Sequence, residues 1–172
     1  MLGNSKISRI KKAARDLPIE FASVTVSDRE LAGTDIDPLP EPILETGVWD
    51  EPHWNQSVYS DEKGADLLEK ILAIVSNGSF PKKGARNDLT REQRHQLRDA
   101  MILQAHVREG RDILVTNDKK AFIGRNGSTR QKLERLCSTR IMSEDEFYAY
   151  CASMHSSRRF PPQVKASLSR AQ

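Results

Sequence analysis

Three acidic residues, Glu30, Asp99 and Asp118, are the side chains of this sequence best placed to do chemistry. Asp118 comes three residues after the apolar segment Ile113–Val115, and Glu30 comes four residues after Val26. Ligands of parallel sheets bind beyond the carboxyl ends of the strands, so we expect both acids there. Converging carboxylates repel one another, and their oxygens suit a hard cation such as Mg²⁺ or Mn²⁺. The pattern indicates a metal site able to activate water against a phosphodiester.

Asp99 approaches this site from a helix. It lies within the longest expected helix, residues 90–109, and its i+3 and i+4 neighbours are Ile102 and Leu103. An acid at the edge of an apolar sector is costly unless a metal ion or an arginine compensates it. His95, one turn earlier, shares the face of Asp99 and could touch the same site, although an ordinary exposed histidine is the favoured interpretation.

Each of the three acids also has an ordinary structural alternative. Glu30 completes a capping box with Ser27, and Asp118 caps the segment that follows it. Asp99 pairs with an arginine such as Arg98 or points to water. The placement of the three carboxylates relative to one another distinguishes a metal site from these roles.

Helical and strand patterns alternate along the chain. Apolar spacing predicts helices at 5–15, 61–76, 90–109, 128–136 and 143–151, and strands at 19–26, 113–115 and 140–142. The Ser/Thr-x-x-Glu/Gln capping pattern begins at Ser27, Thr90, Ser128 and Ser143. This order predicts an α/β, three-layer fold in which a short parallel sheet is flanked by helices.

The chain is expected to form one domain at 1–152, followed by a basic, flexible tail at 153–172. A long irregular segment at about 33–60 carries Pro38, Pro40, Pro42 and Pro52. Loops of this length are uncommon and are often functional. No acidic residue follows Glu146, which leaves the expected tail polar and basic.

The distribution of apolar residues and cysteines indicates where the protein is expected to reside. No apolar run approaches the roughly 20 residues that cross a bilayer, and the N-terminus lacks the apolar stretch of a signal peptide. Cys137 and Cys151 form neither a disulfide framework nor a CxxC pair. We therefore expect a cytoplasmic protein without a membrane partner.

Basic residues gather before the longest expected helix, although the net charge is only +3. Lys82, Lys83 and Arg86 belong to this group. Basic patches attract phosphate backbones through counterion release, and the alternative is a solvated face. We predict these three residues as RNA contacts.

Asp99 on a helix, followed by an apolar strand and Thr116-Asn117-Asp118, forms a composite motif that resembles the C-terminal half of PIN domains over residues 90–150. Residues 143–147 resemble the ending of that family. Upstream, residues 24–31 resemble the strand and helix that carry another of its acidic residues, which falls on Glu30.

PIN domains are typically metal-dependent nucleases, most often ribonucleases, and many are toxins of toxin–antitoxin pairs. The resemblance implies that Glu30, Asp99 and Asp118 hold Mg²⁺ or Mn²⁺, that Thr116 and Asn117 shape the site, and that RNA is the substrate. An antitoxin or a second copy of the chain are possible partners that it also implies.

One departure from the family motivates an alternative. PIN domains usually open with a central strand that bears another Asp, whereas this sequence begins in what looks like the following helix. Without that strand we expect fewer metal ligands and exposed sheet edges that invite association. The alternative function is a PIN-like RNA- or protein-binding module with weak or no catalysis.

Overall fold

Short apolar segments form a four-stranded sheet in the computed structural model, which describes residues 4–24, 43–46, 57–58, 61–157 and 164–168. Its strands are β1 (Ile19–Ala22), β4 (Ile113–Val115), β5 (Arg140–Met142) and β6 (Val164–Leu168). They run in the order β1-β6-β4-β5, and each neighbouring pair is parallel. A separate parallel pair joins β2 (Glu45–Thr46) to β3 (Ser57–Val58). The expected α/β class with a short parallel sheet is confirmed.

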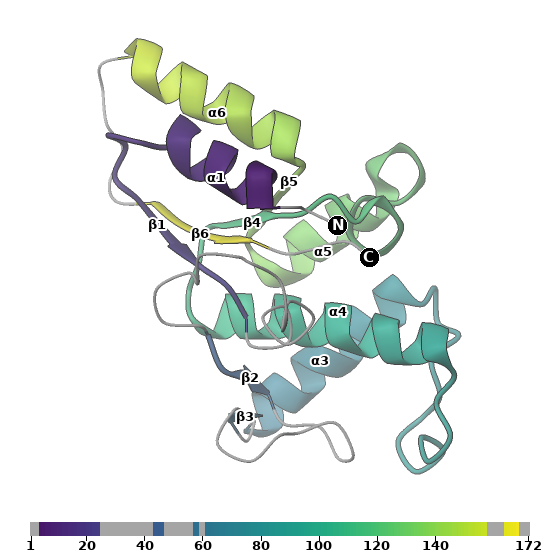
Figure 1. The fold of residues 1–172 in the computed structure, drawn as a ribbon. Helices are drawn as coiled ribbons and strands as arrows, with labels where there is room; N and C mark the ends of the chain where they lie inside the picture. The colour runs from purple at the N-terminus through teal and green to yellow at the C-terminus, as the bar shows by residue number, and fades with distance from the viewer. Residues whose placement is uncertain (1–3, 25–42, 47–56, 59–60, 158–163, 169–172) are drawn as a thin grey trace.

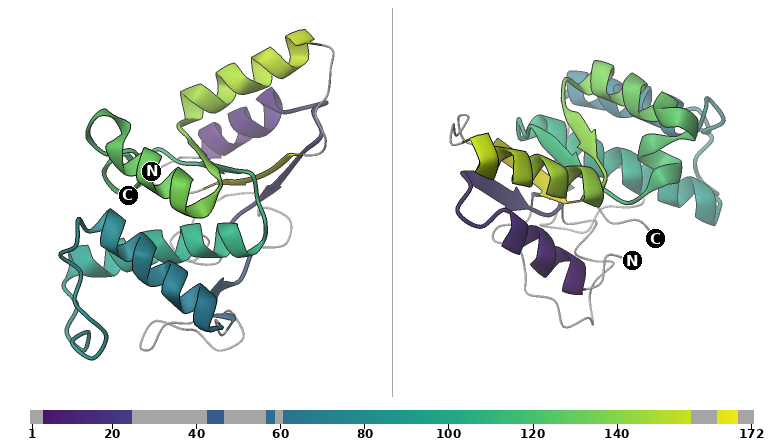
Figure 2. Two further views of the ribbon diagram at one scale, coloured as in Figure 1. Left: turned by 180° about the vertical axis from the view of Figure 1, so that it is seen from behind. Right: turned by 90° about the horizontal axis from the view of Figure 1, so that it is seen from above.

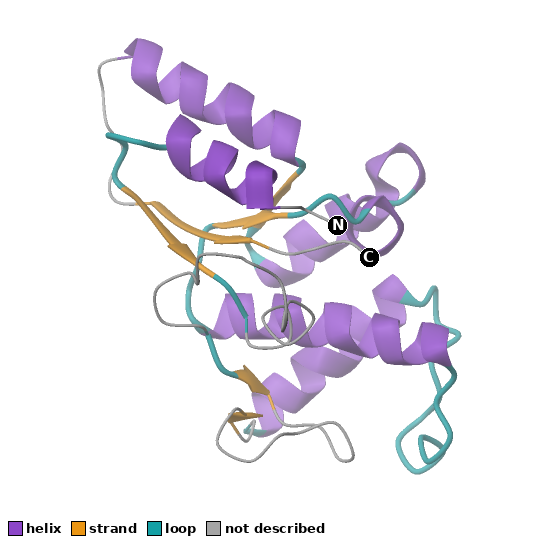
Figure 3. Ribbon diagram, viewed as in Figure 1, coloured by secondary structure: helices purple, strands orange, loops and turns teal. Residues whose placement is uncertain are grey.

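Helices cover both faces of this sheet (Figures 1 and 3). One face carries α1 (Asn4–Ala13) and α6 (Glu144–Ser157), and the other carries α3 (Glu62–Val75), α4 (Arg91–Arg108) and α5 (Ser128–Cys137). Figure 2 shows the same separation from behind and from above. The expected three layers, helices, sheet and helices, are therefore present.

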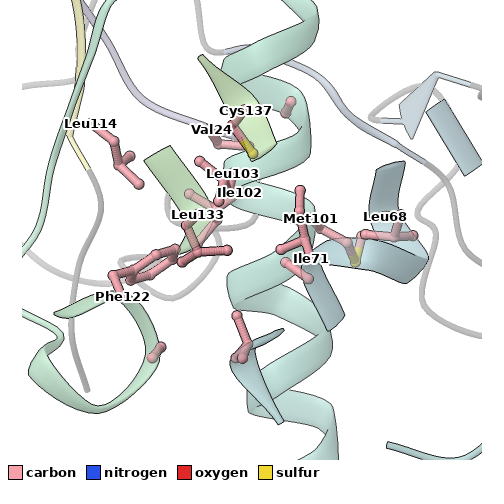
Figure 4. Packing of buried hydrophobic residues seen from close by; sticks show 14 of the residues in the cluster. Val24, Leu68, Ile71, Met101, Ile102, Leu103, Leu114, Phe122, Leu133 and Cys137 are labelled. Carbon is pink, nitrogen blue, oxygen red and sulfur yellow. The ribbon is translucent and has the colours of Figure 1, made fainter. Parts of the chain in front are cut away.

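The residues of β4 show why both faces need cover. Leu114 packs into the core beneath α3, α4 and α5, whereas Ile113 and Val115 pack against α1 and α6. All three are at most 1% exposed, as expected for a parallel strand buried on both faces. In the larger core, Met101, Ile102 and Leu103 of α4 lie near side chains of α3 and α5 (Figure 4).

Two of the four predicted capping boxes are confirmed. At the start of α4 the Thr90 side chain accepts from the Gln93 amide, and the Gln93 side chain accepts from the Thr90 amide. At α6 the Ser143 amide donates to the Glu146 carboxylate at 2.7 Å, and the Glu146 amide donates to Ser143 Oγ at 3.2 Å. The cap predicted at Ser128 is wrong, because Gly127 (φ 74°) enters α5 from the left-handed region and Ser128 already has helical angles. The fourth pattern, at Ser27, lies outside the described residues.

The flexible tail predicted at 153–172, and with it the domain limit at 152, is wrong for the described part of that segment. α6 continues to Ser157, and β6 takes a central place in the sheet, between β1 and β4. The backbone of Lys165 holds it, donating to Asp112 Oδ2 at 2.9 Å and accepting from the Asp112 amide at 2.7 Å. In the described sheet β4 therefore has a neighbouring strand on both sides, and β1 and β5 form the two edges.

The long segment predicted as irregular, 33–60, is described only in part. Ile43 is 6% exposed and forms a parallel bridge with Val24, which ties the segment to the chain leaving β1. β2 and β3 follow from the same segment. The remainder, together with residues 25 and 26 of the predicted first strand, lies outside the described residues.

Candidate functional site

Asp99 and Asp118, from two separate elements, line one cleft of about 550 Å³. Asp99 comes from α4, and Asp118 follows β4 at the carboxyl edge of the sheet. The apolar lining comes from Val75, Ile102 and Ala121, and the remaining polar lining comes from Arg91, Glu92, His95, Gln96, Arg98 and Lys120. The structure therefore brings together two of the three acids that the sequence singled out, and His95 lines the same cleft.

The position of Asp118 is set by the turn that follows β4. The Thr116 amide donates to the Met142 carbonyl at 2.9 Å, and Thr116 Oγ1, fully buried, accepts from the Asp118 amide at 3.1 Å. Asp118 Oδ1 then accepts from the Ala121 amide at 2.8 Å and caps the short helix Lys119–Ile123. The capping role is confirmed, but a carboxylate offers about four acceptor sites and can cap and bind at once.

The third acid, Glu30, lies outside the described residues. Among the described residues, no three Asp, Glu, His or Cys side chains lie together closely enough to hold a metal ion. The two carboxylates in the cleft are oxygen donors of the kind that Mg²⁺ and Mn²⁺ prefer. Of the residues predicted to hold such a cation, Asp99 and Asp118 therefore line the described part of the cleft.

An ion pair joins the two walls of this cleft. Lys120, beyond β4, hydrogen-bonds to Glu92 in the first turn of α4. This bond lowers the pKa of Glu92 and raises that of Lys120, and the charge of Asp118 raises the Lys120 pKa further. Both side chains of the pair are exposed, at 83% for Lys120 and 63% for Glu92, so solvent and salt weaken the bond. Because the bond is weak, an anionic ligand in the cleft can replace Glu92 as the partner of Lys120, close to Asp118.

Asn117, predicted to shape the site, contacts α6. Its Nδ2 donates to Glu144 Oε2 at 3.0 Å, and its Oδ1 accepts from the Glu144 amide at 3.3 Å. The Tyr148 hydroxyl donates to Glu144 Oε1 at 2.9 Å, and the Arg9 guanidinium lies over the Tyr148 ring at 5.4 Å. Burial, and then the bond to Glu144, raise the pKa of Tyr148 to about 12. Sequence reasoning missed Glu144, because an acid in the first turn of a helix is common.

The predicted RNA contacts Lys82, Lys83 and Arg86 do not line this cleft. Arg86 instead holds the loop before α4 onto α3: its guanidinium donates twice to Glu69, at 2.9 and 2.7 Å, and lies over the Phe80 ring at 5.0 Å. Lys82 and Lys83 are exposed. The cations at the cleft are Arg91, Arg98 and Lys120, of which the first two belong to the same basic stretch of sequence.

The described helices include none with the length and apolar character needed to span a membrane. Comparison of the chain with protein-family models, with characterised proteins and with solved structures finds no match.

Proposed function

We propose that the chain is an endoribonuclease that hydrolyses RNA phosphodiesters at this cleft with the help of Mg²⁺ or Mn²⁺. One observation carries the proposal: Asp99 on α4 and Asp118 beyond β4 line the same cleft at the carboxyl edge of a parallel sheet. The resemblance to PIN domains, which rests on these same two residues, supports it. Glu30 enters as the third acid from the sequence alone.

In this proposal Asp99, Asp118 and Glu30 are the ligands of the cation. A bound divalent cation lowers the pKa of a coordinated water and stabilises negative charge that develops on the phosphodiester. The chain also contributes Thr116, whose hydroxyl fixes the Asp118 amide and so limits the directions in which that carboxylate can point.

Three cations of the cleft are suited to hold the RNA strand. Arg91, Arg98 and Lys120 line it together with the two acids. Cationic side chains bind phosphates of any sequence through charge and counterion release. We therefore expect cleavage of single-stranded RNA with an affinity that falls steeply as salt rises.

The test is cleavage of a labelled single-stranded RNA with Mg²⁺ or Mn²⁺, with and without EDTA. Asp118→Asn and Asp99→Asn are expected to abolish cleavage, and an asparagine at 118 keeps an oxygen able to accept from the Ala121 amide. Asp88→Asn, at an exposed acid that does not line the cleft, is the matched control. Undiminished cleavage in both cleft variants would refute the proposal.

A second candidate, an RNA-binding PIN-like module without catalysis, has one observation in its favour. No three potential metal-binding side chains come together among the residues that the structure describes, whereas three cations line the cleft. This candidate predicts salt-dependent RNA binding that EDTA leaves unchanged, and no cleavage of the RNA.

A toxin-type role within the first candidate predicts growth arrest on expression, relieved by Asp118→Asn.

A further inference from the structure

Glu144 is a buried carboxylate that the proposed reaction does not use. Its residue is only 7% exposed at the first position of α6. One carboxylate oxygen accepts from Asn117 Nδ2 and the other from the Tyr148 hydroxyl, while the Glu144 amide donates back to Asn117 Oδ1. A buried carboxylate is costly unless hydrogen bonds satisfy it, so its presence needs a reason.

Glu144 is bonded to Asn117, the residue immediately before Asp118. Asn117 stands between Thr116 and Asp118 on the segment that leaves β4. The Thr116 amide is bonded to Met142 at the end of β5, and the Asn117 side chain is bonded in both directions to Glu144 at the start of α6. The two residues before Asp118 are thus fixed from two different elements.

The geometry points to Glu144 as a positioning residue for the cleft: its carboxylate clamps Asn117 and thereby fixes the direction in which Asp118 enters the cleft. Residues that orient a ligand from behind typically change metal affinity or activity by about 10- to 100-fold when they are removed. The metal-binding part of this inference rests on the proposed function, whereas the positioning part concerns only the turn itself.

Three variants separate positioning from general stability. Glu144→Ala removes the carboxylate of the clamp and leaves only the backbone amide of residue 144 to donate to Asn117 Oδ1. Glu144→Gln keeps the clamp, because its oxygen accepts from Asn117 and its amide donates to the Tyr148 oxygen, which can act as an acceptor. Asp145→Ala, at the exposed neighbour in the same turn, removes the same charge near the helix N-terminus and serves as the matched control.

The first measurement is hydrogen exchange of two amides, Asp118, which donates to Thr116, and Ala121, which donates to Asp118. Glu144→Ala is expected to speed their exchange by about tenfold, corresponding to the loss of one or two hydrogen bonds. Glu144→Gln and Asp145→Ala are expected to match the wild type. If Glu144→Ala does not fold, Asn117→Ala removes both bonds between Asn117 and Glu144 and is expected to give at least the same increase.

The second measurement is calorimetric binding of Mn²⁺ alone. Glu144→Ala is expected to weaken it by about 10- to 100-fold, with Glu144→Gln restoring it. A wild-type chain that binds no Mn²⁺ would count against the proposed function but leave the exchange test of positioning intact. Exchange unchanged in both Glu144→Ala and Asn117→Ala, or equal losses in Glu144→Ala and Glu144→Gln, would overturn the clamp.

Discussion

His106 makes the stability of this fold sensitive to mild acid. It is 0% exposed near the amino ends of β4 and β5, with Nε2 at 2.6 Å from Thr139 Oγ1. The Thr139 hydroxyl also lies within donating distance of the Arg111 and Asp112 carbonyls, at 3.3 and 3.0 Å, and when it donates to either of them its oxygen accepts from Nε2–H of His106. His106 Nδ1 has no hydrogen-bond partner among the described residues. The folded state therefore holds a neutral imidazole, and protonation would bury an unpartnered N–H⁺.

The size of this acid-induced loss of stability follows from the shift in the pKa of His106. Burial, and then the charge of Arg111, lower the pKa of His106 from 6.5 to about 4. Because the folded pKa lies below the unfolded one, this contribution to stability is present above pH 6.5 and is lost as pH falls toward 4. Linkage gives a loss of about 2 kcal/mol between pH 8 and pH 5, and about 3 kcal/mol at the acid limit.

Urea unfolding at pH 8 and pH 5, in wild type and His106→Gln, measures this loss. The glutamine can still donate to Thr139 but does not titrate, so it is expected to be less stable at pH 8 and to lose about 2 kcal/mol less than wild type on acidification. His155→Gln, at an exposed histidine, is the control and should follow wild type. Equal acid losses in wild type and His106→Gln would refute the reasoning.

Two further predictions concern charged side chains. Glu92→Gln frees Lys120 and should tighten binding of single-stranded RNA several-fold at low salt. Lys120→Gln should weaken binding and reduce by about 0.7 the slope of log affinity against log salt concentration. Equal affinities of the two variants in filter binding would contradict this. Arg86→Ala removes the bonds to Glu69 and should lower the free energy of unfolding in urea by about 2 kcal/mol, while exposed Lys82→Ala should change it by less than about 0.5 kcal/mol. A variant Arg86→Ala as stable as Lys82→Ala would exclude the structural role.

The sequence predicted those parts of the fold that local rules determine. The helices α3 and α4 have long apolar periods, and Thr90 and Ser143 mark helix starts through contacts between residues only three apart. Asp99 and Asp118 were placed in one cleft because their element types follow from such patterns and parallel strands share a carboxyl edge.

The remaining features depend on contacts between distant residues. β6 has a weak apolar pattern, Val-Lys-Ala-Ser-Leu, and owes its place to pairing with β1 and β4. Arg86 resembles an exposed cation until Glu69, in another helix, is known to face it. Glu144 likewise resembles a helix-start acid until Asn117 is seen beside it. In each case the tertiary fold engages a group whose partner lies too far away in the sequence for local patterns to reveal.

The position of β6 bears on how strongly the proposed site can bind a cation. β6 occupies a central place in the sheet, between β1 and β4, and its neighbour β1 follows α1 in the chain. The strand that fills this place contains a lysine and no acid. Within the described sheet β6 offers no carboxylate to the cleft, so the proposed site depends on Asp99, Asp118 and Glu30. With three acids proposed to hold the cation, a small misplacement of Asp118 should be costly. For this reason we expect the clamp at Glu144 to affect metal binding more than stability.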